Sequence, residues 1–124
     1  MKVIFTADGP TLSSPTDPRF GRCANFILVD TESMTAHSYL NESRQAMGGA
    51  GIQAGQFVSS LSAEALVTGQ VGPNAARVLL AAGIKIYVGA SGTVQQALDD
   101  FRAGKLKEAS AATVAPHSGM GGKR

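Results

Sequence analysis

Short apolar runs alternate with helical patterns along the chain, and together they predict a mixed α/β domain. Val3–Phe5 and Phe26–Val29 are continuous apolar runs closed by polar or turn-forming residues, which is typical of buried strands. A polar turn at residues 31–33 follows, and from Met34 to Leu40 the two sides of the chain alternate with period two. The third run therefore predicts a hairpin that ends in an edge strand.

Three later segments follow the period of an amphipathic helix. The first has apolar residues at i, i+3, i+4 and i+7, namely Ala54, Phe57, Val58 and Leu61. The second begins at Pro73, where the missing N–H of a helix's first turn costs nothing, and ends at Gly83. The third opens with a capping box of Thr93 and Gln96, and we expect Gly104 to cap its C-terminus.

Two strands separate these helices, one starting at Ala65 and one at Ile84. The predicted order is βββαβαβα, in which a helical crossover makes the last two strands parallel while the first three form a meander. We expect this mixed sheet to span a domain of residues 1–106. Residues 107–124 are rich in Gly, Ala and Ser and predict a flexible tail.

Composition narrows the possible functions. The 124 residues fit one domain, and the formal charge of +2 gives no strong field for nucleic-acid binding. No apolar run approaches the ~18 residues of a membrane span, and the N-terminus lacks the hydrophobic region of a signal peptide, so we expect a soluble, cytoplasmic protein. The single cysteine excludes an internal disulfide framework.

Three loops carry the candidate binding chemistry. In the first, Arg19 and Arg22 stand on either side of Phe20 and Gly21, and two guanidinium groups beside a flexible backbone suit an anion. The alternative is that both arginines are solvated and that Phe20 is a core anchor. The other two loops are glycine-rich helix starts at residues 47–51 and 69–75. Backbone N–H groups and a helix dipole there favour anions; tight turns alone would explain the same glycines.

Soft metal ligands are sparse in the chain. Cys23 is either such a ligand or, more often for a lone cysteine beside a strand, a small buried hydrophobe. His117 and Met120 lie in the expected tail, where imidazole and thioether groups could close over a soft metal cluster, or simply remain in a disordered segment.

Catalytic patterns are weak. Ser91 has no surrounding nucleophile elbow, and Asp8 has no obvious partner carboxylates for two-metal nuclease chemistry. We therefore do not expect an enzyme.

Taken together, the segments DPRFGRCANFILVD, VTGQVGPNAARVLLAAGIKIYVG and SGTVQQALDDFRAGKL resemble the dinitrogenase iron-molybdenum cofactor biosynthesis family. The resemblance covers roughly Met1 to Leu106. It implies a ribonuclease H-like mixed sheet with helices on its faces, without implying nuclease activity. It further implies that an anionic metal-sulfur cluster is bound but not chemically altered. This chain has Met47, Gly48, Gly49 and Ala50 where other members carry a cysteine or histidine.

Carried over position by position, the implied cofactor-binding residues fall in the three loops: Arg19, Phe20, Gly21, Arg22, Gly48, Gly49, Gly51, Gly72, Pro73 and Asn74. The candidate metal ligands are Cys23, His117 and Met120.

The leading hypothesis is a small carrier or scaffold for a cluster of molybdenum with iron or copper, used in cofactor assembly, delivery or storage. Its expected partners are the cluster or its precursor and cofactor-assembly proteins, with no nucleic acid or membrane, and the oligomeric state stays open. The alternative is a regulatory or interaction module that binds a protein partner or a nucleotide without metal.

Overall fold

A computed structural model of the chain describes residues 1–110 and shows one mixed sheet with helices on both faces. The elements, in chain order, are β1 (Lys2–Ala7), β2 (Asn25–Asp30), β3 (Thr35–Leu40), α1 (Ala50–Ser60), β4 (Ala65–Val67), α2 (Pro73–Ala81), β5 (Lys85–Val88), α3 (Val94–Arg102) and β6 (Lys107–Ala109). The predicted succession of strands and helices up to α3 is confirmed.

The six strands lie in the order β3-β2-β1-β4-β5-β6. β1 pairs antiparallel with β2 and parallel with β4, and β5 continues the parallel part. β3 is the outer strand of the predicted hairpin, and most of its residues are exposed. Because β1 and β4 run in the same direction, their carboxyl ends meet at one edge of the sheet.

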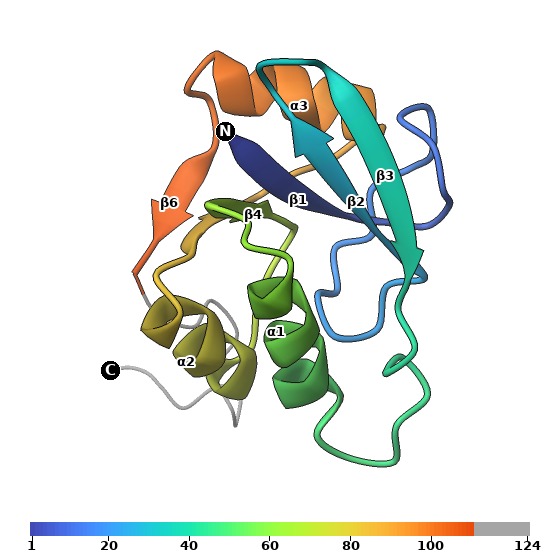
Figure 1. Cartoon of the computed structure of the whole chain (residues 1–124), viewed down its shortest axis with the longest axis vertical. Coiled ribbons are helices and arrows are strands. Elements are labelled where there is room, and N and C mark those ends of the chain that lie inside the picture. Colours follow the sequence, from blue (N-terminus) through green and yellow to red (C-terminus); the bar gives the residue numbers. More distant parts are fainter. Residues whose placement is uncertain (111–124) are drawn as a thin grey trace.

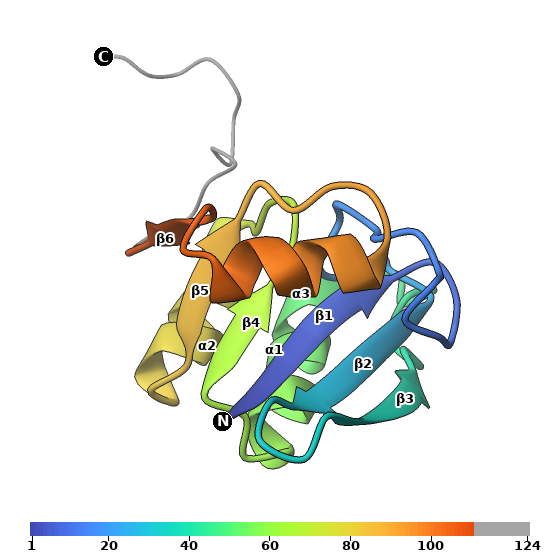
Figure 2. The same ribbon diagram turned by 90° about the horizontal axis from the view of Figure 1, so that it is seen from above.

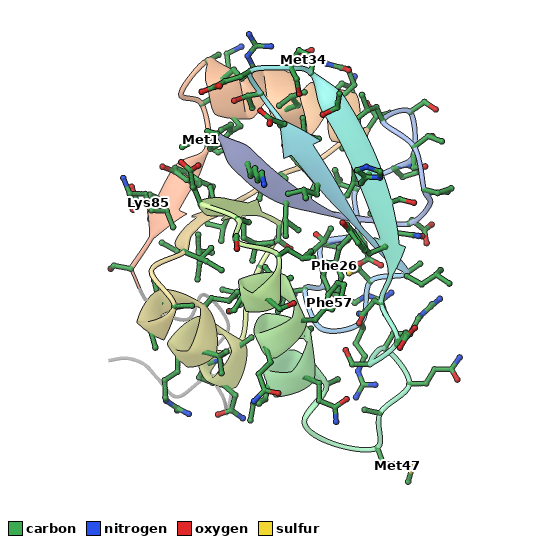
Figure 3. The ribbon with its side chains drawn as sticks, viewed as in Figure 1. Met1, Phe26, Met34, Met47, Phe57 and Lys85 are labelled. Carbon is green, nitrogen blue, oxygen red and sulfur yellow. The ribbon has the colours of Figure 1, made fainter. Side chains whose placement is uncertain are left out.

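Helices α1 and α2 cover one face of the sheet, and α3 covers the other (Figures 1 and 2). Ile4 of β1 belongs to the core under α1 and α2, whereas its neighbours Val3 and Phe5 belong to the core under α3. With both faces covered, β1 is apolar at consecutive positions rather than at alternate ones. On the first face Phe57 of α1 lies against Phe26 of β2, with ring centroids 5.8 Å apart (Figure 3).

Local signals in the sequence correctly placed the helix ends. The Thr93 hydroxyl accepts a hydrogen bond from the Gln96 N–H at 3.1 Å, and the Thr93 N–H donates to the Gln96 side chain at 2.8 Å. Pro73 occupies the first turn of α2. Gly83 and Gly104 follow α2 and α3 with φ values of 81° and 74°, which a glycine adopts without strain.

The expectation of a tail from residue 107 onward requires a correction. Lys107–Ala109 form β6, an antiparallel edge strand in which Ala109 is paired with Ile86 and buried. Three residues are too few to show a period in the sequence, and the pairing is made with a strand about twenty positions earlier. The rest of the expected tail, from residue 111, lies outside the described residues.

Within residues 1–110, no helix has both the length and the apolar character needed to cross a bilayer.

Candidate functional site

The three predicted loops come together at the carboxyl ends of β1 and β4. They line an open cavity of about 320 Å³ between the segment after β1 and the first turns of α1 and α2. Its lining residues are Arg19, Phe20, Gly21, Gly49, Ala50, Gly51, Ile52, Gln70, Gly72, Pro73, Asn74 and Ala75. All of the predicted cofactor-binding residues except Arg22 and Gly48 are among them.

Close backbone contacts hold the loops together. A Cβ built on Gly21 would lie 3.1 Å from the Gly51 nitrogen, and one on Gly69 would lie 2.5 Å from the Pro18 Cα. The Gln70 N–H also donates to the Pro18 carbonyl at 2.9 Å. The arginine loop is therefore packed directly on the start of α1 and on the segment after β4, and glycine is what allows this approach.

Arg19 supplies the charge at the cavity. Its Nε donates to Asp17 Oδ1 and its Nη2 to Asp17 Oδ2, both at 3.2 Å. The Arg19 side chain is 58% exposed, whereas that of Asp17 is 6% exposed. The carboxylate thus holds one edge of the guanidinium from behind, and Arg19 remains accessible at the cavity wall.

Arg22 has a different position from Arg19. Its Nη1 donates to the carbonyl oxygens of Arg44 and Ala46, at 2.6 and 3.0 Å. Arg22 therefore ties down the segment that leads into α1 and does not line the cavity. Met47, in the same segment, is fully exposed and points away from the body of the protein (Figure 3).

The first turns of two helices contribute backbone donors. Neither the N-cap of α1, Gly49, nor that of α2, Gly72, provides a side-chain cap. The leading N–H groups of a helix have no intrahelical acceptor and carry the positive end of its dipole. A Cβ at Gly49 or Gly72 would meet no atom within 4 Å, so the space in front of both turns is open.

Of the three predicted metal ligands, Cys23 alone belongs to the described residues, and it does not line the cavity. Cys23 is fully buried, and its Sγ contacts the Phe20 carbonyl at 3.3 Å. Burial raises the pKa of its thiol to about 12, so the thiolate that binds metals is scarce at neutral pH. His117 and Met120 lie outside the described residues. Within residues 1–110 no group of three or more His, Cys, Asp and Glu residues is placed to hold a metal ion.

Four lining residues were not predicted: Ala50, Ile52, Gln70 and Ala75. Each lies in or beside a glycine-rich segment that was predicted, and the helix starts themselves signalled the first-turn positions. Gln70 belongs to the predicted glycine-rich segment 69–75, but only the structure shows its parallel bridge with Arg19.

A second, larger cavity of about 760 Å³ lies between β3 and α1, where Tyr39 and Phe57 pack edge to face. None of the predicted site residues lines it.

Comparisons with known proteins agree with the sequence resemblance. The family model described as "Dinitrogenase iron-molybdenum cofactor" matches residues 1–104. An uncharacterized protein of Methanocaldococcus jannaschii is 27% identical over 111 residues, which cover 87% of this chain and 91% of that protein.

Two solved structures share the fold at higher identity. The apo form of the orange protein from Desulfovibrio gigas superposes with a TM-score of 0.87 and 41% identity, covering 90% of this chain and 95% of that one. A putative NifB protein from Thermotoga, solved by NMR, gives a TM-score of 0.80 and 38% identity, covering 90% and 96% of the two chains.

Proposed function

The chain belongs to the dinitrogenase iron-molybdenum cofactor family, and from that premise we propose that it is a small non-catalytic carrier or scaffold for an anionic metal-sulfur cluster. The cargo is a molybdenum sulfide with iron or copper, held for cofactor assembly, delivery or storage. We also propose that this domain has a ribonuclease H-like fold, because its sheet combines parallel and antiparallel strands.

The observation that carries the proposal is the convergence of three separate loops on one cavity. Arg19 and two helix N-termini without side-chain caps surround about 320 Å³, which is within the roughly 300–1,000 Å³ usual for small-molecule sites. All three features favour a negative charge.

The donor chemistry also fits such a cargo. Ile52 and Pro73 provide apolar surface next to the N–H donors, whereas the Phe20 ring is buried in the core. A thiometallate is a diffuse, polarisable anion, so guanidinium groups, backbone N–H groups and apolar contacts suit it without a cage of thiolates. The proposed role needs no catalytic group, because the cluster is bound and passed on.

Partners follow from this role. A carrier must receive its cluster from one protein and give it to another, so we propose cofactor-assembly proteins of the cytoplasm as partners. The similarity to a putative NifB protein supports this class of partner.

The decisive experiment is anaerobic reconstitution. The protein is incubated with tetrathiomolybdate, alone and with copper(I), or with an iron-sulfide donor, and then desalted. Elemental analysis and the visible spectrum are expected to show a stable chromophore with stoichiometric metal. If the wild-type protein takes up none of these species, the carrier proposal is wrong. The alternative, an interaction module that binds no metal, is then favoured.

The role of Arg19 is tested in the same assay. Arg19→Ala should weaken retention by about ten- to 150-fold, because a charge-assisted hydrogen bond is worth about 1.5–3 kcal/mol. The loss should be greater at low salt than at high salt, since exposed charges are screened. Arg102→Ala, on α3 across the sheet, is the matched control and should retain the cluster like wild type.

A further inference from the structure

The net side-chain charge at the cavity is smaller than the single positive charge of Arg19. Of the described residues that line it, Arg19 alone is charged. Asp17 lies directly behind Arg19 and accepts three hydrogen bonds from it: from the backbone N–H at 2.9 Å and from Nε and Nη2 at 3.2 Å. The side chains therefore bring almost no net charge to the site.

Asp17 is fixed in this position by the ends of two strands. Its N–H donates to the Thr6 carbonyl at 3.0 Å, and its own carbonyl accepts from the Thr6 hydroxyl at 2.6 Å. The Thr6 hydroxyl also lies 2.8 Å from that of Thr68 at the end of β4. These contacts fix the backbone of Asp17 at the strand ends, and its buried carboxylate is held by the three hydrogen bonds from Arg19.

The carboxylate is ionised at neutral pH. Burial raises the pKa of Asp17, but the hydrogen bonds and charge of Arg19 outweigh that effect and leave it below its ordinary value. Arg19 uses two of its five side-chain N–H donors on Asp17, and the others remain for a ligand.

The cavity thus offers hydrogen-bond donors and apolar surface with little net side-chain charge. A strongly hydrated oxyanion loses much solvation energy on entering such a site, and no full positive charge compensates it. A large polarisable anion of the same charge holds its water less tightly, so it loses less.

We infer that Asp17 is a specificity-determining residue: by neutralising Arg19, it makes the cavity select weakly hydrated, polarisable anions over hydrated oxyanions of equal charge and shape. This inference rests on the proposed function, because it requires the cavity to bind an anion at all.

Tetrathiomolybdate and molybdate are the matched probes, because both are tetrahedral dianions and differ in sulfur against oxygen. Their dissociation constants for the full chain are measured anaerobically at neutral pH by equilibrium dialysis with elemental analysis. Wild type is expected to prefer tetrathiomolybdate by about tenfold or more. Asp17→Asn, which removes the charge at constant size, should shift that ratio about tenfold toward molybdate. Asp17→Glu keeps the charge and should stay near wild type.

Asp99→Asn removes an exposed carboxylate from α3 and is the control for net charge; its ratio should not change. If Asp17→Asn weakens both anions equally, or leaves their ratio unchanged, the inference is overturned while the carrier proposal stands. If wild type binds neither anion, the inference is overturned, and the carrier proposal is then decided by the reconstitutions with copper(I) and with the iron-sulfide donor.

A competition experiment with wild type covers the case in which Asp17→Asn does not fold. At equal concentration, thiosulfate should displace tetrathiomolybdate more effectively than sulfate does, because both are tetrahedral dianions and thiosulfate carries a sulfur atom in place of one oxygen. Equal displacement by the two salts would contradict selection by hydration.

Discussion

Gly21 and Gly51 approach so closely that a Cβ on Gly21 would lie 3.1 Å from the Gly51 nitrogen and 3.2 Å from its Cα. The contact joins the arginine loop to the first turn of α1, two segments thirty positions apart in sequence. Both residues also line the cavity, so the distance between these backbones sets the position of its wall.

Gly21→Ala should therefore affect both stability and binding. The added methyl group has to displace backbone rather than a flexible side chain, and such overpacking costs about 1–3 kcal/mol. Urea unfolding should show a lower midpoint, and retention of tetrathiomolybdate should fall.

Gly48→Ala is the matched control, because a Cβ there meets no atom within 4 Å. It should unfold within about 0.5 kcal/mol of wild type. Equal midpoints for the Gly21 and Gly48 variants would show that the two loops separate without cost.

The two arginines of the first loop should behave differently. Because Arg22 donates to the carbonyl oxygens of Arg44 and Ala46, Arg22→Ala should speed amide hydrogen exchange in residues 44–49 by about tenfold or more, equivalent to about 1.4 kcal/mol of lost protection. Arg19→Ala should leave exchange in that segment unchanged and weaken anion retention instead. If Arg22→Ala weakened anion retention and Arg19→Ala speeded exchange in residues 44–49, Arg22 rather than Arg19 would face the bound anion.

Cys23 should be unreactive in the folded protein. Its thiol is buried and its pKa is raised to about 12, so at mildly alkaline pH very little reactive thiolate exists. Iodoacetamide should label the native protein slowly and the urea-unfolded protein quickly, as followed by mass spectrometry. Rapid native labelling would contradict the buried position.

The variant Cys23→Ala tests whether Cys23 only packs in the core or also binds metal. If the residue only fills the core, the variant loses about 1 kcal/mol of stability and keeps its capacity for tetrathiomolybdate. If the variant folds but no longer binds stoichiometric metal, the result would support Cys23 as a metal ligand.

Acid should destabilise the fold through Asp17. Its folded pKa lies below the ordinary 3.8, so its ionised form contributes stability that is complete above that value. The contribution is lost as the pH falls from 3.8 through the lowered folded pKa. Thermal melts across this range should show a steeper fall in Tm for wild type than for Asp17→Asn. Parallel curves would mean that the carboxylate gains nothing from Arg19.

Much of the fold could be predicted because its signals are local. The apolar run at Val3–Phe5, the Thr93–Gln96 capping box and the first-turn Pro73 each fix an element through neighbouring residues alone. β6 could not be predicted, since three residues become a strand only by pairing with β5.

The loops of the site could also be predicted, because arginine and glycine are unusual enough in such spacing to stand out. The contact of Gln70 with the arginine loop could not be predicted, since its bridge to Arg19 joins positions about fifty residues apart.

The sequence by itself thus determined the order of the elements and the three loops that carry the candidate chemistry. Only the tertiary structure decided that Arg19 lines the cavity while Arg22 braces a neighbouring segment, and that Asp17 neutralises the first of them. The physical reason is the range of the interactions involved. Helix and strand formation depend on a few adjacent residues, whereas the direction of a loop side chain depends on acceptors brought in from distant parts of the chain.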